Sequence, residues 1–151
     1  MFLNLRSSKI TIPKSLIEEL KQISKTRYPE EACAILFGNI SKGDVQEIKI
    51  SKVIELRNIV HSPVEFRWDE MEFYHHCLEQ KKEALSFVGV FHSHPDKPYI
   101  SEYDEDIILQ TGKLYPELVW IVYGNQTQTF KAFIRISSTT INEIPINSRH
   151  N

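Results

Sequence analysis

The chain is organised around residues 84–104, whose sequence is ALSFVGVFHSHPDKPYISEYD. The apolar run at its start predicts a buried strand, and a helical pattern begins at Asp104. Alternate residues of a strand point to the same face of the sheet, so His92 and His94 project side by side at the strand end. The proline that follows directs the chain out of the sheet, because it cannot donate a ladder hydrogen bond. The stretch therefore places two histidines between a strand and a helix.

The pattern Ser101-x-x-Asp104 adds a hydroxyl and a carboxylate at the first turn of that helix. Two neutral imidazoles and one carboxylate leave one position open on a tetrahedral zinc ion, which is typical of catalytic rather than structural zinc sites. Each fragment also has an ordinary interpretation, since Ser-x-x-Asp fits a helix cap and the histidines fit a polar strand end. Their combination favours a metal site formed by His92, His94 and Asp104.

Length and composition limit the class of protein. A chain of 151 residues is long enough for one domain with a sizeable core. We expect that domain to cover residues 1–146 and to be followed by a frayed polar tail at 147–151. The net charge of −2 gives no indication of nucleic-acid binding. No apolar run reaches membrane-spanning length, so we expect no membrane partner.

The two cysteines indicate a reducing compartment. Cys33 and Cys77 show neither a paired metal-binding spacing nor a disulfide framework. The start of the chain, MFLNLR, is interrupted by charge too early for a signal peptide. We therefore expect a cytoplasmic protein. Cys33 lies in an apolar run and is expected in the core.

The apolar patterns predict an α/β fold, a single-domain mixed β-sheet flanked by helices. Strands are expected at residues 9–12, 32–38, 45–56, 118–123, 129–136 and 141–146, in addition to the strand that carries the histidines. Helices are expected after Pro13, from Asp69 to about Glu83, and from about Ser101 to Leu114. The metal residues then lie at the end of a central strand, where such folds commonly place their sites.

Capping patterns and apolar stripes orient the first two helices. Ser15-x-x-Glu18 predicts a capping box at the start of the first helix. In the second helix, an apolar stripe is predicted to face the core; its members are Met71, Tyr74 and Leu78. His75 and His76 also lie in this helix, but adjacent helical residues point about 100° apart and cannot chelate one ion.

Glu31 stands at the entrance of the buried run that begins at Ala32. Most glutamates are solvated, and the pattern alone favours a loop residue here. A carboxylate pointing into the molecule is the other interpretation.

Two motifs of the sequence resemble the signature of the JAMM (MPN-plus, JAB-type) metallopeptidases. His92-x-His94-Pro95 followed by Ser101-x-x-Asp104 matches one motif, and the segment 29–38, PEEACAILFG, is similar to the family's other block. Two departures are present. The interval from His94 to Asp104 is one residue shorter than in the usual family pattern, which makes Asp106 a fallback ligand, and Ala34 stands where many members carry glycine.

The resemblance implies a JAB/MPN architecture, similar to that of cytidine deaminases, with one zinc ion per chain. His92, His94 and Asp104 would hold the zinc, Glu31 would be the general acid and base, and Ser101 would stabilise the oxyanion. The compact chain looks most like a prokaryotic member of the family. The implied activity is an isopeptidase or peptidase that cleaves the amide bond after the C-terminal tail of a ubiquitin-like protein, with no covalent acyl-enzyme.

Three alternatives remain at this point. A peptidase of the same fold could release a small amino acid, such as cysteine, from a ubiquitin-fold sulfur-carrier protein. A chain of this family could also be a non-catalytic interaction module. Proteasome-related and sulfur-carrier proteins are further candidate partners of the chain. A zinc deaminase is disfavoured, because the Pro-Cys-x-x-Cys half of its signature is absent.

Overall fold

A computed structural model describes residues 7–149 of the chain. The expectations for the first residues and for the last two therefore lie outside the described part. Eight strands form one sheet: β1 (Ser7–Pro13), β2 (Cys33–Ser41), β3 (Val45–Leu56), β4 (Ser86–His94), β5 (Val119–Gly124), β6 (Thr129–Arg135), β7 (Ile141–Ile144) and β8 (Ile146–Arg149). Three helices pack on it: α1 (Lys14–Arg27), α2 (Glu70–Lys82) and α3 (Glu102–Thr111). The predicted α/β class is confirmed.

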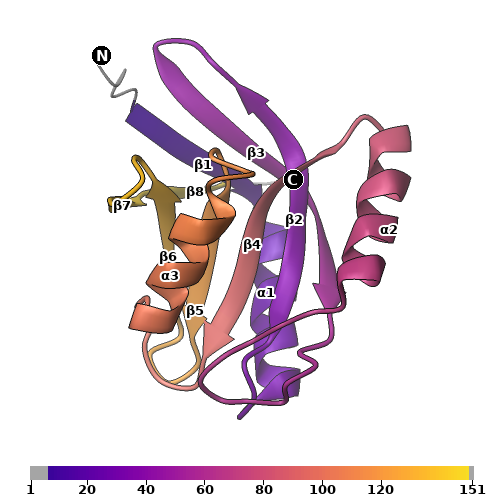
Figure 1. Ribbon diagram of the computed structural model, residues 1–151, viewed down its shortest axis with the longest axis vertical. Helices are drawn as coiled ribbons and strands as arrows, with labels where there is room; N and C mark the ends of the chain where they lie inside the picture. The colour runs from indigo at the N-terminus through magenta and orange to yellow at the C-terminus, as the bar shows by residue number, and fades with distance from the viewer. Residues whose placement is uncertain (1–6, 150–151) are drawn as a thin grey trace.

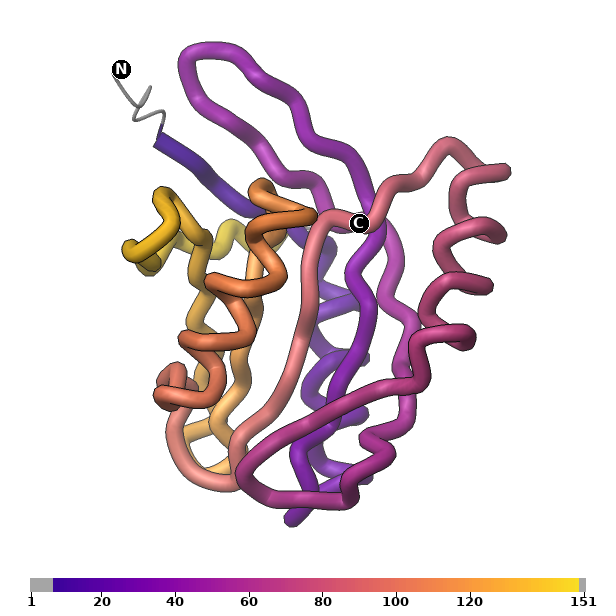
Figure 2. The backbone as a smooth tube through the Cα atoms, in the orientation of Figure 1, coloured from indigo at the N-terminus to yellow at the C-terminus, as the bar shows by residue number. Residues whose placement is uncertain are grey.

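The helices lie on opposite faces of the sheet (Figure 1). Helix α1 packs behind the sheet in this view, whereas α2 and α3 lie on the face toward the viewer. Strand β4 is central, between β2 and β5. The tube in Figure 2 shows the segment between β3 and α2 crossing the sheet near the end of β4. The end of β4 is therefore where elements from distant parts of the sequence meet.

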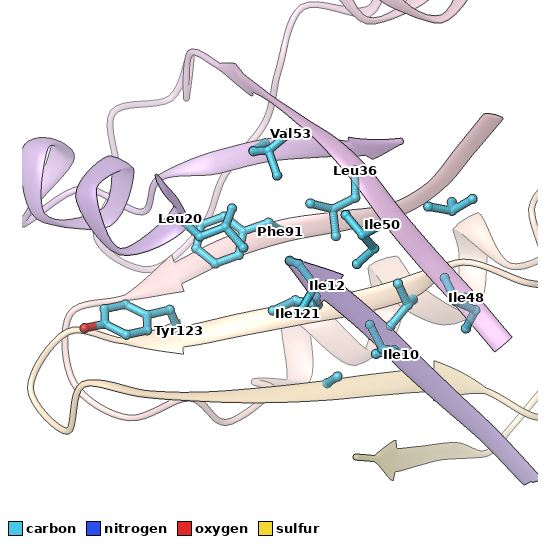
Figure 3. Packing of buried hydrophobic residues seen from close by; sticks show 14 of the residues in the cluster. Ile10, Ile12, Leu20, Leu36, Ile48, Ile50, Val53, Phe91, Ile121 and Tyr123 are labelled. Atoms are coloured by element: carbon cyan, nitrogen blue, oxygen red, sulfur yellow. The ribbon is translucent and has the colours of Figure 1, made fainter. Parts of the chain in front are cut away.

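The side chains of the central strands alternate between the two faces. On the α1 side, Phe91 of β4 and Ile121 of β5 pack with Leu20 of α1 in the largest apolar cluster (Figure 3). On the other side, Val90 and Trp120 pack beneath α3. This alternation is the two-residue period expected of strands buried on both faces. It puts His92 and His94 on the face that α2 and α3 cover.

The two edges of the sheet are consecutive in the sequence. The order of strands is β7-β6-β5-β4-β2-β3-β1-β8, and Pro145 alone separates β7 from β8. We expected one edge strand over residues 141–146 and a frayed tail after it. Instead the chain divides at the proline, and residues 146–149 pair in parallel with β1. This pairing satisfies the free backbone groups of the β1 edge.

Two predictions about helices were wrong. The residue that caps α1 is Pro13, and no side chain caps that end, so the helix begins before the predicted Ser15 capping box. Helix α2 begins after Asp69 as expected, but its stripe of Met71, Tyr74 and Leu78 is exposed. The helix contacts the sheet through another face, on which Phe73 and Cys77 lie one turn apart. An apolar stripe in the sequence therefore does not show which face of a helix packs against the sheet.

Among residues 7–149, the longest helices are too short or too polar to cross a bilayer.

Candidate metal centre

Strand β4 holds the two histidines rigidly in the middle of the sheet. His92 is paired with Cys33 of β2 on one side and with Val122 of β5 on the other. Its side chain is 1% exposed and that of His94 is 4% exposed. Their Nε2 atoms lie 3.2 Å apart. The predicted side-by-side arrangement is therefore present.

The first turn of α3 places the carboxylate of Asp104 beside the two histidines. Ser101 caps this helix: its hydroxyl accepts a hydrogen bond from the Asp104 backbone at 3.1 Å, and its own N–H donates to Asp104 Oδ2 at 3.0 Å. This is a complete capping box. The cap and the metal-type ligand are therefore not rival interpretations, because the same carboxylate serves both.

Asp104 Oδ2 lies 3.0 Å from His94 Nε2 and 3.3 Å from His92 Nε2. A tetrahedral zinc ion with bonds of about 2.0–2.1 Å separates its ligand atoms by about 3.3 Å. The three atoms already approximate one face of such a tetrahedron. Neutral imidazoles and a carboxylate are also the ligands that zinc takes in catalytic sites. These residues therefore fit one zinc ion.

The electrostatics keep His92 and Asp104 in the protonation states that bind a metal. Burial lowers the pKa of His92, although a hydrogen bond with Asp104 opposes this shift. Burial alone would raise the pKa of Asp104, but hydrogen bonds from His92 and His94 outweigh it and hold this pKa well below its usual range. At neutral pH His92 is therefore uncharged and Asp104 is ionised.

Glu31 joins this cluster from a different part of the chain. Its side chain is fully buried, and its Oε2 lies 3.5 Å from His94 Nδ1. Ligand atoms of Glu31, His92, His94 and Asp104 all lie within 4.8 Å of one another. Neither carboxylate oxygen of Glu31 has a hydrogen-bond partner in the described structure. The solvated-loop interpretation was wrong: this carboxylate points inward.

Burial raises the pKa of Glu31 to about 9, with the charge of Asp104 as the next cause. A cation beside the cluster would favour the ionised carboxylate. The arrangement is therefore that of an acid whose proton affinity depends on its neighbours, which is typical of functional sites.

The backbone of Glu31 is fixed on both sides. Its N–H donates to the carbonyl of Ser62 at 2.9 Å, and its carbonyl accepts from Asn58 Nδ2 at 3.0 Å. The next residue, Ala32, donates its N–H to the hydroxyl of Ser93 at 2.9 Å. No sequence motif marks Asn58, Ser62 or Ser93, so their contacts with this segment could not be found from the sequence.

The shortened loop between the two ligand segments is held by the turn after β5. Asn125 donates its backbone N–H to the His94 carbonyl at 2.9 Å, and the next N–H reaches Asp96 O at 3.1 Å. A Cβ atom on Gly124 would lie 2.6 Å from that Asp96 oxygen, so the close approach requires glycine. The loop is thus short but well supported. The fallback ligand Asp106 is exposed and lies outside the cluster.

Two aromatic rings flank the histidines. Phe66 stacks on His92 with ring centroids 4.9 Å apart, and Tyr99 stacks on His94 at 5.0 Å. Phe66 also forms a wall of a largely apolar cavity of 380 Å³ between α2 and α3. The other walls include Trp68, Phe73 and Tyr103. The cluster therefore adjoins an apolar cavity on the His92 side.

A central strand ending in two histidines, a capped aspartate and a buried glutamate define the class of protein. Residues 13–136 match the family of prokaryotic homologues of the JAB domain. The chain belongs to this family, and the resemblance seen in the sequence is confirmed.

Two relatives cover nearly the whole chain. A desampylase of Pyrococcus furiosus is 32% identical over 140 residues, which are 92% of this chain and 90% of that protein. A protein of Desulfitobacterium hafniense, whose solution structure is known, is 26% identical and superposes with a TM-score of 0.77 over 94% of both chains.

Proposed function

We propose that this protein is a zinc-dependent isopeptidase or peptidase. Its reaction would cleave the amide bond after the C-terminal tail of a ubiquitin-like protein by direct attack of water. The single observation that carries the proposal is the position of Glu31, a buried carboxylate with two unpartnered oxygens beside three ligand atoms that fit zinc. A desampylase among the relatives supports the same class of reaction.

The side chains divide the chemistry between them. Zinc bound by His92, His94 and Asp104 would act as a Lewis acid and lower the pKa of the attacking water toward ~7. Glu31 accepts the proton of that water and passes it to the departing amine. Water attacks directly, so no acyl-enzyme forms.

Ser101 contributes a hydrogen-bond donor to the same step. Its hydroxyl oxygen accepts the N–H of Asp104, which leaves its own proton to donate to the developing oxyanion. Removal of such a donor can cost ~3 kcal/mol of transition-state stabilisation. The cap thus orients the hydroxyl for catalysis.

The substrate tail would reach the site between Phe66 and Tyr99, whose rings stack on the two histidines. An extended tail lying there can place an apolar side chain in the cavity between α2 and α3. Both cysteines of the described structure are free thiols, which supports a reducing cytoplasm as the place of action.

The test compares wild type with Glu31→Gln, using a linear fusion to a ubiquitin-like protein. We expect about one zinc ion per chain in both proteins and a loss of cleavage of ~10²–10⁴-fold in the variant. Glu30→Gln is the matched control, because this neighbouring carboxylate is partly exposed and, among residues 7–149, bonds only the side chain of His61. Absence of zinc from the wild type, or full activity of Glu31→Gln, would refute the proposal.

A further inference from the structure

Asn58 lies two residues beyond the end of β3, in the connection to α2. It is 6% exposed, although the residues on either side of it are more accessible. A buried amide needs partners for two donors and for an oxygen with two lone pairs. The partners of Asn58 account for all of them.

The amide nitrogen of Asn58 bonds two separate pieces of backbone. Nδ2 donates to the carbonyl of Glu31 at 3.0 Å and to that of Glu65 at 3.0 Å, with the Ser62 carbonyl farther away at 3.4 Å. Glu31 and Glu65 are 34 residues apart in the sequence. One side chain thus joins the segment that carries the buried carboxylate to the segment that crosses the end of β4.

The amide oxygen of Asn58 bonds two backbone groups of the same connection between β3 and α2. Asn58 Oδ1 accepts the N–H of Val60 and that of Arg67, both at 3.2 Å. A backbone bond from Ile59 to the Arg67 carbonyl lies beside it at 2.8 Å. These contacts fix the residue that precedes Arg67, which is the Phe66 stacked on His92.

We propose that Asn58 is a positioning residue, which fixes Glu31 and Phe66 relative to the histidines through the saturated hydrogen bonds of one amide. The proposal rests on the proposed function for its kinetic effect. The metal ligands come from β4 and α3, and Asn58 bonds neither element in the described structure. Its loss should therefore displace Glu31 and Phe66 but leave the zinc ligands in place.

The test uses the zinc-loaded full-length chain with Asn58→Ala. We expect kcat for the linear fusion to fall about 10²-fold, since a displacement of about 1 Å can cost that much. The zinc content should stay at about one per chain, and the absorption spectrum of the cobalt-substituted protein should be unchanged. Ser24→Ala is the matched control: this buried hydroxyl bonds only the Leu20 carbonyl on α1, and its loss should leave kcat unchanged.

A second variant covers the case in which Asn58→Ala does not fold. Asn58→Asp has the same size and keeps the oxygen that accepts from Val60 and Arg67, but it cannot donate to Glu31. We expect it to lose kcat with zinc retained. A wild-type kcat in Asn58→Asp, or a loss of kcat that only follows a loss of zinc, would overturn the proposal.

Amide hydrogen exchange tests the same positioning without activity. In Asn58→Ala, the amides of Glu31 and Arg67 should exchange at least about tenfold faster, and those of α3 should not. If the wild type cleaves no fusion, the proposed function fails while this measurement still decides the role of Asn58. Unchanged protection at both amides would overturn it.

Discussion

The candidate metal ligands His92, His94 and Asp104 share one cluster with Glu31, but the chain places the ligands and Glu31 by different kinds of contact. The ligands lie within residues 92–104 and are held by a strand end and a helix cap, in which the bonding residues are three apart. Glu31 depends on residues distant in sequence: Asn58 lies 27 positions away, and the Ser93 bond to Ala32 spans 61. The candidate ligands thus come from one short segment of the chain, whereas Glu31 is placed beside them by long-range contacts.

The largest expected effect, on zinc content and cleavage, comes from removing one of the candidate metal ligands. His94→Ala removes the central ligand, whose nitrogen contacts both His92 and Asp104. We expect the zinc content to fall from about one per chain to near zero and cleavage to fall by about 10⁴-fold or more. Metal analysis and cleavage of the fusion measure both. His75→Ala, on the exposed part of α2, should change neither, and retained zinc in His94→Ala would contradict the assignment.

A smaller effect is expected from Ser101, which caps α3 and is also the proposed oxyanion donor. Ser101→Ala removes both the oxyanion donor and the helix cap. We expect kcat to fall about 100-fold, which corresponds to ~3 kcal/mol, and the free energy of unfolding to fall by ~1 kcal/mol. Ser101→Thr keeps the hydroxyl and should restore most of both. Kinetics and urea unfolding separate the two losses; a loss of stability alone would assign Ser101 to the cap only.

A pH-dependent effect on stability is expected from Glu31 in metal-free protein. The folded pKa of about 9 exceeds the usual 4.5, so between these values the folded chain binds a proton that the unfolded chain lacks. Stability therefore falls as pH rises through this window, by ~1.4 kcal/mol per pH unit. Glu31→Gln removes this dependence and should raise the free energy of unfolding at pH 7 by at most about 3.4 kcal/mol.

Urea unfolding in the presence of a chelator, repeated at several pH values, measures this difference. Glu30→Gln should keep the wild-type slope of stability against pH. Parallel slopes for Glu31→Gln and wild type would show that Glu31 does not titrate in this way.

The smallest expected effect concerns the support of the ligand loop. Gly124→Ala places a methyl group against the Asp96 carbonyl, and the loop after His94 must shift to accommodate it. We expect a loss of about 1–2 kcal/mol in the free energy of unfolding and a several-fold weaker zinc affinity. Gly43→Ala is the matched control, because a Cβ there meets nothing closer than 3.9 Å. Equal zinc affinity in both variants would show that the loop does not position the ligands.

This comparison explains what could be predicted from the sequence. Strand alternation and the Ser-x-x-Asp cap predicted that His92, His94 and Asp104 would lie together, because both rules depend on short spacings. Most helix and strand positions followed from apolar periodicity for the same reason. The roles of these residues in the reaction stay predictions.

Long-range placement could not be obtained in this way. The burial of Glu31 depends on hydrogen bonds to Asn58 and Ser62, which no pattern connects to it. The stripe of α2 has the periodicity of a buried one, but it is exposed because the helix packs on the sheet through Phe73 and Cys77 instead. The parallel pairing of β8 with β1 joins opposite ends of the chain. Each of these facts requires knowledge of which elements become neighbours.

The pairing of β8 with β1 has a consequence for folding during synthesis. Ile10 pairs with Ile146, so the outer edge of β1 lacks this partner until residue 146 has been synthesised. All four residues of the cluster are available by position 104, and β5, which flanks the histidine strand, ends at Gly124. The nascent chain can therefore bring these four residues together while β1 still has a free edge. Contacts of such high sequence separation form slowly, and β8 completes the sheet after the other strands have been synthesised.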